Sequence, residues 1–527
     1  MPLTRRRSRA VNESKCRHLF VNCYTPHTAA SLPCCPGQNH SGRGLIRNNT
    51  MEDNRKHVIT RIFHGLFFIT PMLLGIYGYW FKEGLPLQDA AFKTLNYYTL
   101  NNDDIPTNMF QEVARWMAPL MTVGTIALFF QNVRDIFFGI LARIRGTTTA
   151  VYGREPEKQI LLDQLGVLGI QGKDRFVKAD RYIFCGDEAE NLTLYSRFQE
   201  RLKGRPVYAK SDHLIDLGAK DDLYLFNPWE TAARLYWKKR CLYPEAKAKN
   251  FHLSICLIGF EDLGQRLLIY GLMDNIFHPD QMIEYHVFGD SAKFRHIYHG
   301  IRQISDPVTF HDEPWYECLE ILGKADRIIV TDNTNSLNQI LRAVPAVKVD
   351  YLTDQSSEMH MTNYKNQLNV FDYGEEVWKV DRIVRETLLM NAKRINMYYV
   401  HEYDDAHPAQ TMENAEAAWK KLDTFTRYSN ISSADYHDIQ RAMLAEDQIL
   451  PKELLEEKNS AYLEMLSCLE HERWCRYHYL NNWTFGSGKK DPLHRTHPLL
   501  LPNDRLPDSE KVKDLNNLKV MFHLLEQ

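Results

Sequence analysis

The fold is decided by two similar stretches: Lys178-Ala179-Asp180-Arg181-Tyr182-Ile183-Phe184-Cys185-Gly186-Asp187 and Lys324-Ala325-Asp326-Arg327-Ile328-Ile329-Val330-Thr331-Asp332-Asn333. Each begins Lys-Ala-Asp-Arg, continues as a β-branched or aromatic run, and ends in a polar turn. A helical pattern follows each copy, and then another short apolar run at 205–210 or 346–352. Strand, turn, helix and strand form the unit typical of parallel sheets. Its repetition predicts two tandem doubly wound α/β lobes, at residues 146–245 and 246–375.

The second lobe has the more complete pattern. A strand at 251–258 leads into Gly259-Phe260-Glu261-Asp262-Leu263-Gly264 and a helix, and a second strand at 283–288 ends at Gly289-Asp290. This layout is typical of the dinucleotide-binding turn of Rossmann-like folds, and it makes Gly259, Phe260, Gly264 and Asp290 candidate ligand-binding residues. A lone pair of glycines at this spacing is weak evidence. Glu261 occupies the place of the middle glycine and would repel phosphate, which disfavours NAD. A purely structural role and the binding of another small ligand stay open.

The first lobe is shorter. Its candidate strand at 148–152 lies much closer to residue 178 than the strand at 251–258 lies to residue 324. It also lacks a phosphate-binding glycine run. We therefore expect this lobe to be truncated or rearranged.

Two apolar stretches precede the lobes, at 58–81 and 116–133. The first is long enough to cross a bilayer core of about 30 Å, and its Tyr77, Tyr79 and Trp80 resemble an interfacial belt. The second continues more amphipathically as far as Leu141. We interpret residues 51–145 as a transmembrane hairpin in the lipid bilayer, with two buried helices of a soluble bundle as the alternative. Basic residues flank the hairpin on both sides, which places both termini in the cytoplasm at the inner (plasma) membrane: Arg55, Lys56, Arg61, Arg134, Arg143, Arg145 and Arg154.

The segment between the spans resembles a potassium-channel pore loop in outline. A short amphipathic pattern at 87–98 is followed by Thr99-Leu100-Asn101-Asn102-Asp103, and Pro106 comes shortly after. A potassium filter needs glycines that allow its carbonyls to line the pore, and none occurs here. The filter is therefore replaced or lost, and a conducting pore and a plain extracytoplasmic loop both stay open.

Two membrane helices followed by tandem lobes resemble channels that carry regulator-of-potassium-conductance (RCK) domains. The resemblance covers residues 55–360 and rests on the order of elements and on the repeat. It implies that the lobes pair, within or between chains, and that ligand binding to them is passed to the membrane part. A pore would need a homo-oligomer, since two helices cannot enclose one alone. Such coupling requires a ligand whose affinity differs between two states.

The C-terminal residues contain a long ordered pattern: His471-Glu472-Arg473-Trp474, Asn482-Trp483-Thr484-Phe485-Gly486, His497-Pro498-Leu499, Leu506-Pro507, Glu510-Lys511 and Asp514. It resembles the repeat domain of ryanodine receptors (the RyR domain), which also occurs singly in bacterial proteins. The family usually has glycine where this chain has Asn482, so the local turn is in question. The resemblance implies a small, mostly helical domain at 456–527, joined to the lobes by a helical linker at 376–455.

The aromatic residues of this domain support two interpretations. They are either the core of a small domain or the walls of a pocket with a cationic rim, which suits a small anionic or nucleotide-like ligand. The candidate residues are Arg473, Trp474, Trp483, Phe485, His497 and Lys511, with Lys489, Lys490 and Arg495 at the rim.

Residues 1–50 are basic, aperiodic and rich in Ser, Asn, Pro and Gly, so we expect them to be disordered. Met51 begins more ordinary sequence and is our predicted start of translation, with a basic regulatory or targeting arm as the alternative. A formal net charge of −3 gives no indication of nucleic-acid binding. The ten cysteines include no C-x-x-C pair, which argues against zinc ribbons and suits a reducing cytoplasm.

No catalytic motif is present: there is no G-x-S-x-G, no H-E-x-x-H and no Walker lysine loop. The sequence predicts that the protein is not an enzyme, and it names no cofactor or metal. The leading hypothesis is a membrane-anchored, potassium-channel-like ligand sensor. A non-conducting membrane-tethered scaffold is the alternative, and an NAD-dependent oxidoreductase is the interpretation that Glu261 opposes.

Overall fold

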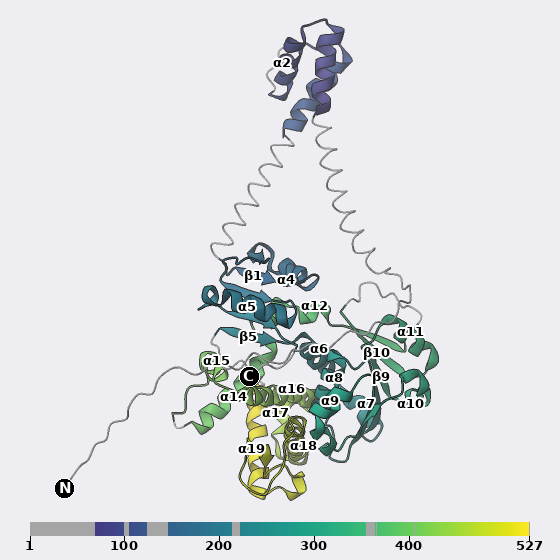
Figure 1. Ribbon diagram of the computed structural model, residues 1–527, viewed down its shortest axis with the longest axis vertical. Coiled ribbons are helices and arrows are strands. Elements are labelled where there is room, and N and C mark those ends of the chain that lie inside the picture. Colours follow the sequence, from purple (N-terminus) through teal and green to yellow (C-terminus); the bar gives the residue numbers. More distant parts are fainter. Residues whose placement is uncertain are drawn as a thin grey trace, which may run out of the picture. The chain divides into compact units, whose positions relative to one another are not determined.

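The computed structural model describes residues 69–99, 105–123, 146–212, 222–354, 364, 366–404 and 406–525 (Figure 1). The chain divides into two compact units, Met1–Arg134 and Asp135–Gln527.

The described residues of the first unit are mostly helical. An α-helix at 69–77 continues as the π-helical turn η1 (Gly78–Lys82), α2 spans Leu87–Tyr98, and residues 109–123 form another helix. The hydroxyl groups of Tyr79 and Tyr97 lie 2.9 Å apart in the interior, where Ala90, Ala114 and Ala118 are also buried. Small residues thus fill the contacts between these helices.

The predicted spans at 58–81 and 116–133 lie partly outside the described residues, as do Leu100, Asn101, Asn102 and Asp103. Among the helices that the structure describes, none combines the length and apolar character needed to cross a bilayer. The short helix predicted before Thr99 is present as α2. The Thr99 hydroxyl donates to the Asn96 carbonyl at 3.1 Å and so helps to end that helix.

The first lobe contains a five-stranded parallel sheet. Its strands are β1 (Thr149–Tyr152), β2 (Gly169–Gln171), β3 (Arg181–Phe184), β4 (Val207–Lys210) and β5 (Leu223–Phe226), in the order β2-β1-β3-β4-β5. The same order occurs in flavodoxin-like folds. Val151 and Ile183 are buried on one face while Tyr152 and Phe184 are buried on the other. Burial of both faces is typical of a doubly wound sheet.

The second lobe contains a six-stranded parallel sheet. Its strands are β6 (His252–Ile258), β7 (Met282–Phe288), β8 (Val308–His311), β9 (Arg327–Val330), β10 (Lys348–Thr353) and β11 (Leu368–Asp372), in the order β11-β10-β9-β6-β7-β8. This is the strand order of the Rossmann fold. The first lobe has one strand fewer, and its β2 is only three residues long.

The sequence repeat falls on equivalent strands. In the first lobe β3 pairs with β1, and Arg181 lies opposite Thr149. In the second lobe β9 pairs with β6, and Arg327 lies opposite Ile255. Each repeated strand therefore lies beside the first strand of its own sheet, which is where the strand order reverses in doubly wound folds.

Helices cover the two sheets and connect them. The first lobe and the connection to the second contain α4 (Glu157–Leu165), η2 (Gly166–Leu168), α5 (Glu188–Leu202), α6 (Pro228–Lys239) and α7 (Tyr243–Ala248). The second contains α8 (Asp262–Asp274), α9 (Ala292–Ile297), η3 (His299–Gln303), η4 (Trp315–Glu317), α10 (Leu319–Lys324) and α11 (Thr334–Ala343). The lobes meet through α6 and α8, where the buried Trp237 indole N–H donates to the Leu267 carbonyl at 2.9 Å.

The C-terminal part is mostly helical. It contains α12 (Gly374–Val377), α13 (Val380–Val384), η7 (Thr387–Leu389), α14 (Met390–Tyr403), α15 (Met412–Lys420), α16 (Thr424–Glu446), α17 (Pro451–Leu454), η8 (Glu457–Asn459), α18 (Ser460–Leu480), η9 (Asn503–Arg505) and α19 (Asp508–Leu525). The short parallel strands β12 (Thr484–Phe485) and β13 (Thr496–His497) lie between α18 and η9. Helix α16 packs against α14, α18 and α8, and α18 packs against α19 (Figure 1).

Asn482, where the RyR family usually has glycine, lies in the turn that directly follows α18. Asn482 adopts a left-handed backbone with φ of 60°, which asparagine tolerates better than most residues other than glycine. Its side chain accepts the Gly300 N–H at 3.0 Å and donates to the Ile297 carbonyl at 2.7 Å. Asparagine here preserves the turn and adds two hydrogen bonds to the second lobe.

Candidate functional site

The predicted dinucleotide turn lines a crevice of about 950 Å³ at the carboxyl ends of β6, β7, β9 and β10. Gly259, Phe260 and Asp290 lie in its wall, and Gly264 packs behind it. Among the described residues, five carboxylates line this crevice and no lysine or arginine does: Glu261, Asp262, Asp290, Asp332 and Asp354. The crevice lies where nucleotides bind in related folds, but its charge repels phosphate.

Gly264 has a packing role that does not depend on a ligand. A Cβ at this position would lie 2.1 Å from the carbonyl oxygen of Gly259, which itself has φ of 90°. The glycines let α8 approach the end of β6 closely, and this explains why the pattern is present although phosphate binding is disfavoured.

We expect Gly264→Ala to lower the free energy of unfolding by about 1–3 kcal/mol, because α8 must move away from the turn. Gly323→Ala is the matched control, since nothing lies within 4 Å of its added Cβ. Chemical denaturation of both variants measures the difference. Equal free energies of unfolding for the two variants would contradict the close approach of α8 to the turn at Gly259.

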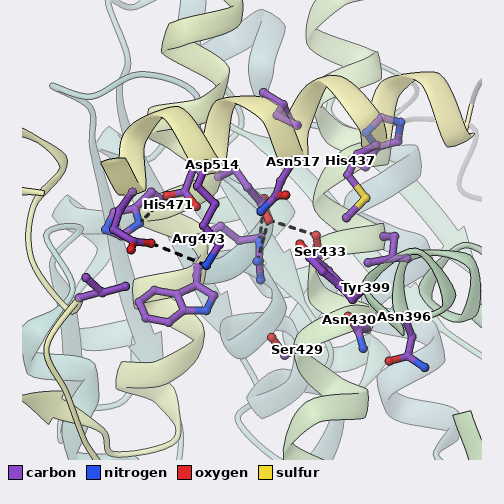
Figure 2. Close-up of a pocket in the computed structure, with 18 of the residues that line it drawn as sticks. Asn396, Tyr399, Ser429, Asn430, Ser433, His437, His471, Arg473, Asp514 and Asn517 are labelled. Atoms are coloured by element: carbon purple, nitrogen blue, oxygen red, sulfur yellow. Dashed lines mark hydrogen bonds and ion pairs between the residues drawn. The ribbon is translucent and has the colours of Figure 1, made fainter. Parts of the chain in front are cut away.

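Another candidate site lies between the helical linker and the C-terminal domain. This cavity, cavity A, has a volume of about 470 Å³. The helices α14 and α16 form one side, and α18, α19 and the chain between them form the other (Figure 2). Its lining residues are Ile395, Asn396, Tyr399, Tyr403, Thr426, Ser429, Asn430, Ser433, His437, Gln440, Glu470, His471, Arg473, Trp474, His497, Leu499, Leu506, Glu510, Lys513, Asp514, Asn517, Leu518 and Met521.

The principal charges in cavity A are internally neutralised. Arg473, only 3% exposed at its side chain, donates two hydrogen bonds to Glu470 at 2.8 and 2.9 Å. His471 Nδ1 lies 3.3 Å from an Asp514 oxygen. Burial disfavours charge on His471, yet its hydrogen bonds to Asp514 and Cys475 raise its pKa to about 10. The imidazolium is therefore the form present at neutral pH, paired with Asp514.

Two polar side chains in cavity A lack hydrogen-bond partners among the described residues. They are Asn396, through its Nδ2, and His437, through both ring nitrogens. Each residue is only 4% exposed. Burial lowers the pKa of His437 to about 4, so the neutral ring offers one donor and one acceptor. Figure 2 shows His437 and Asn396 at one end of the cavity, with His471 and Asp514 at the other.

Unsatisfied buried polar groups are rare because each loses the hydrogen bonds that water would supply. An unpaired amide or imidazole costs about 1–3 kcal/mol. Asn396 and His437 both line cavity A, which makes this cavity a candidate binding site.

An aromatic wall bounds cavity A on the side of the C-terminal domain. The centroid of the Trp474 ring lies 4.0 Å from that of His478 and 4.9 Å from that of His497, and His478 lies 5.4 Å from Trp483. Burial lowers the pKa of His478 to about 3 and that of His497 to about 4. The wall is therefore uncharged at neutral pH.

The structure separates the residues predicted as one aromatic pocket. Arg473, Trp474 and His497 line cavity A, whereas Trp483 lies behind His478 and lines another cavity. The Phe485 side chain is 49% exposed, and Lys511 lies 3.6 Å from Asp508; neither lines cavity A. The single-pocket interpretation is replaced by two cavities that share a wall.

Sequence analysis missed the residues from α14 and α16. A polar stripe at helical spacing on α16 could have indicated them: Thr426, Ser429, Asn430, Ser433, His437 and Gln440. Such a polar stripe normally faces solvent, yet on α16 it lines cavity A. Within the described ranges, no group of histidine, cysteine and carboxylate side chains is arranged to hold a metal ion.

Comparison with known proteins covers the C-terminal segment. No curated protein matches the chain significantly. A family model described as the RyR domain matches residues 451–526, which contain α17, α18 and α19. Residues 451–526 are therefore an RyR domain, and cavity A is formed jointly by this domain and the linker helices that precede it.

Proposed function

We propose that the protein is a ligand sensor in which cavity A receives a small, uncharged polar molecule with a flat face, such as a nucleoside-like compound. The observation that carries the proposal is the pair of buried, unpartnered side chains, Asn396 and His437. A ligand that hydrogen-bonds to these groups removes the free-energy cost of leaving them unpaired, which is present in the protein without ligand. This gain adds to the contacts that the ligand makes.

The shape and chemistry of cavity A favour this ligand class. A volume of about 470 Å³ lies within the usual range for small-molecule sites, about 300–1,000 Å³. Trp474 offers a surface for a planar ring. The main cations of the cavity, Arg473 and His471, are already paired with carboxylates, so cavity A suits the uncharged part of a nucleotide-like molecule better than its phosphate.

Helix α16 connects cavity A to both lobes. Its Ser433 and His437 face the cavity, while its Asp435 forms a buried pair with Arg234 of α6 at 2.6 Å. The neighbouring Tyr436 hydroxyl donates to the Ile276 carbonyl of the second lobe at 2.7 Å. In this proposal, a ligand that binds more tightly to one position of α16 than to another changes how the linker helices pack against the lobes.

The proposal places the sensor at the inner membrane, held by the hairpin of residues 51–145. Described residues of the first unit have large apolar side chains outside, such as Leu73, Phe92 and Trp116 at 62%, 66% and 68% exposure. Small residues lie inside, including Gly75, which packs on Thr94. Water-soluble helices bury their large apolar residues, whereas membrane helices often pack through small ones. The pattern supports a lipid-facing exterior.

A thermal-shift screen of nucleosides and sugars against the purified full-length protein tests cavity A. We expect at least one compound to raise the melting temperature of the wild-type protein. His437→Phe should abolish that response, while stabilising the empty protein by about 1 kcal/mol because an unpaired polar group is removed. The matched control, His299→Phe at an exposed position, should keep the response. An unchanged response in His437→Phe would contradict the site.

Reconstitution in liposomes tests the membrane part of the proposal. A conducting protein should give ion flux that responds to the cavity A ligand and is lost on substitution of Thr99. Flux without any response to a bound ligand would contradict the sensor coupling. Binding without flux would identify a membrane-tethered binding protein instead, which is the second hypothesis from the sequence.

A further inference from the structure

A second cavity, cavity B, lies where the RyR domain meets α8 and the start of α16. Its volume is about 510 Å³. Thr426 lines both cavities, and the rings of Trp474, His478 and Trp483, which pack in tilted and edge-to-face contacts, lie between them. Six aromatic side chains line cavity B: Tyr270, Tyr298, Phe425, Tyr428, Tyr477 and Trp483.

Cavity B carries positive charge that the described protein neutralises only in part, since burial disfavours charge on Arg266 but the Glu230 carboxylate raises its pKa. Arg266, Lys490 and Arg495 line it, and Asp423 is its one acidic residue. Asp423 accepts the Thr426 N–H at 2.6 Å as the cap of α16. None of the three cations forms an ion pair with a carboxylate in the described ranges. Arg266 and Arg495 donate instead to the carbonyls of Asp212 at 3.3 Å and Asn481 at 2.8 Å.

The aromatic and cationic groups lie on the same cavity. The Lys490 ammonium lies 5.6 Å from the centroid of the Trp483 ring, and the Phe425 and Trp483 rings lie 5.4 Å apart. Trp483 is only 5% exposed, so its ring is held in place. The first turn of α16, a helix of 23 residues, adds the partial positive charge of its N-terminus.

Charge distinguishes this cavity from the others. Within the described ranges, the crevice of the second sheet is lined by carboxylates and by no lysine or arginine. The main cations of cavity A are paired. Unpaired guanidinium and ammonium groups make strong charge-assisted hydrogen bonds to carboxylate and phosphate oxygens. Aromatic walls favour a planar ring through stacking.

We propose that cavity B is a binding site for a small anion that carries a planar aromatic ring. The ring lies against Trp483 and Phe425, and the carboxylate or phosphate group lies toward Arg266, Lys490 and Arg495. This site is separate from cavity A and does not depend on the function proposed there. Because Arg266 belongs to α8 and Lys490 to the RyR domain, the bound anion bridges the domain and the second lobe.

Calorimetric titration of the full-length protein tests cavity B with four probes. These are 1-naphthyl phosphate and 1-naphthoate, which combine ring and charge, 1-naphthol, which has only the ring, and inorganic phosphate, which has only the charge. We expect at least one of the two planar anions to bind, and to bind at least about tenfold more tightly than naphthol or phosphate. The comparison of the two anions tells phosphate recognition from carboxylate recognition.

Variants at exposed positions keep the fold intact. Lys490→Gln and Arg495→Gln should each weaken binding of the planar anion by about tenfold, since each removes one charge-assisted contact. Lys489→Gln is the matched control, because Lys489 is exposed and adjacent but does not line the cavity. The proposal is overturned if neither planar anion binds, if naphthol or phosphate alone binds as tightly, or if the control weakens binding as much as the other two variants.

Discussion

Arg476→Met is expected to lower the free energy of unfolding by about 3–5 kcal/mol, because it leaves the Asp306 carboxylate buried without its cation. Arg476 and Asp306 are 1% and 0% exposed at their side chains and lie 2.6 Å apart. Arg476 also donates to the Leu272 carbonyl at 3.1 Å and to Ser305 at 3.1 Å. A single side chain of the RyR domain thus forms three contacts with the second lobe.

Denaturant unfolding followed by tryptophan fluorescence measures this effect. Lys324→Met is the control, since Lys324 and Glu320 form a pair that is 74% and 84% exposed and such pairs contribute about 0–1 kcal/mol. Arg476→Met combined with Asp306→Asn should recover part of the loss, because the unpaired charge is removed. A loss in Arg476→Met no greater than that in Lys324→Met would show that the domain does not depend on this contact.

The second large effect is a pH-dependent contribution of His471 to stability. Its pKa is raised to about 10 in the folded protein by Asp514 and Cys475, against the opposing effect of burial, and it is about 6.5 in an unfolded chain. The folded state therefore holds the proton more tightly. Its contribution is fully present below about pH 6.5 and is lost as the pH rises through about 10. The stabilisation by His471 is at most about 1.4 kcal/mol for each unit by which its folded-state pKa exceeds its unfolded-state pKa.

We expect His471→Gln to be markedly less stable than the wild-type protein at pH 6 and nearly equal to it at pH 10. Asp514→Asn should lower the folded-state pKa of His471, because it removes the carboxylate that lies 3.3 Å from the ring. The pH range over which His471 stabilises the protein should then be narrower. Unfolding midpoints of the three proteins between pH 6 and pH 10 give the comparison. A stability difference that stays constant across this range would show that His471 is not the titrating group.

The α/β part of the fold could be predicted from sequence because the pattern is local. The Lys-Ala-Asp-Arg repeat and its apolar run identify β3 and β9, and the parallel order of both sheets follows from strand and helix alternation. The turn at Gly259 was also recognised, and its residues Gly259, Phe260 and Glu261 line the crevice at the carboxyl ends of the strands.

The candidate site could be predicted only in part, because burial depends on how distant segments pack. Trp474 and Trp483 are close in sequence and appeared to share a pocket. Helix α18 ends at Leu480 and the chain reverses at Asn482, so the two rings lie on opposite sides of His478. Asn396 and His437 gave no pattern of their own, since an unpaired polar group is recognisable only when its surroundings are known.

The shared wall gives the two cavities a physical means of affecting each other. Trp474 contacts His478, and His478 contacts Trp483, so a ring that moves on one side removes support on the other. Tight packing makes such shifts discrete rather than gradual. If binding to one cavity shifts this wall, the affinity of the other cavity changes, and such coupling is equal in both directions.

Calorimetric titration of the best ligand from the screen into the wild-type protein and the Asn396→Leu/His437→Phe variant tests the central claim most directly. The account predicts that the double variant folds at least as stably as the wild-type protein and binds the ligand about a hundredfold more weakly, since two buried hydrogen-bonding groups are lost. Binding of equal affinity to both proteins would contradict the claim that cavity A is the ligand site.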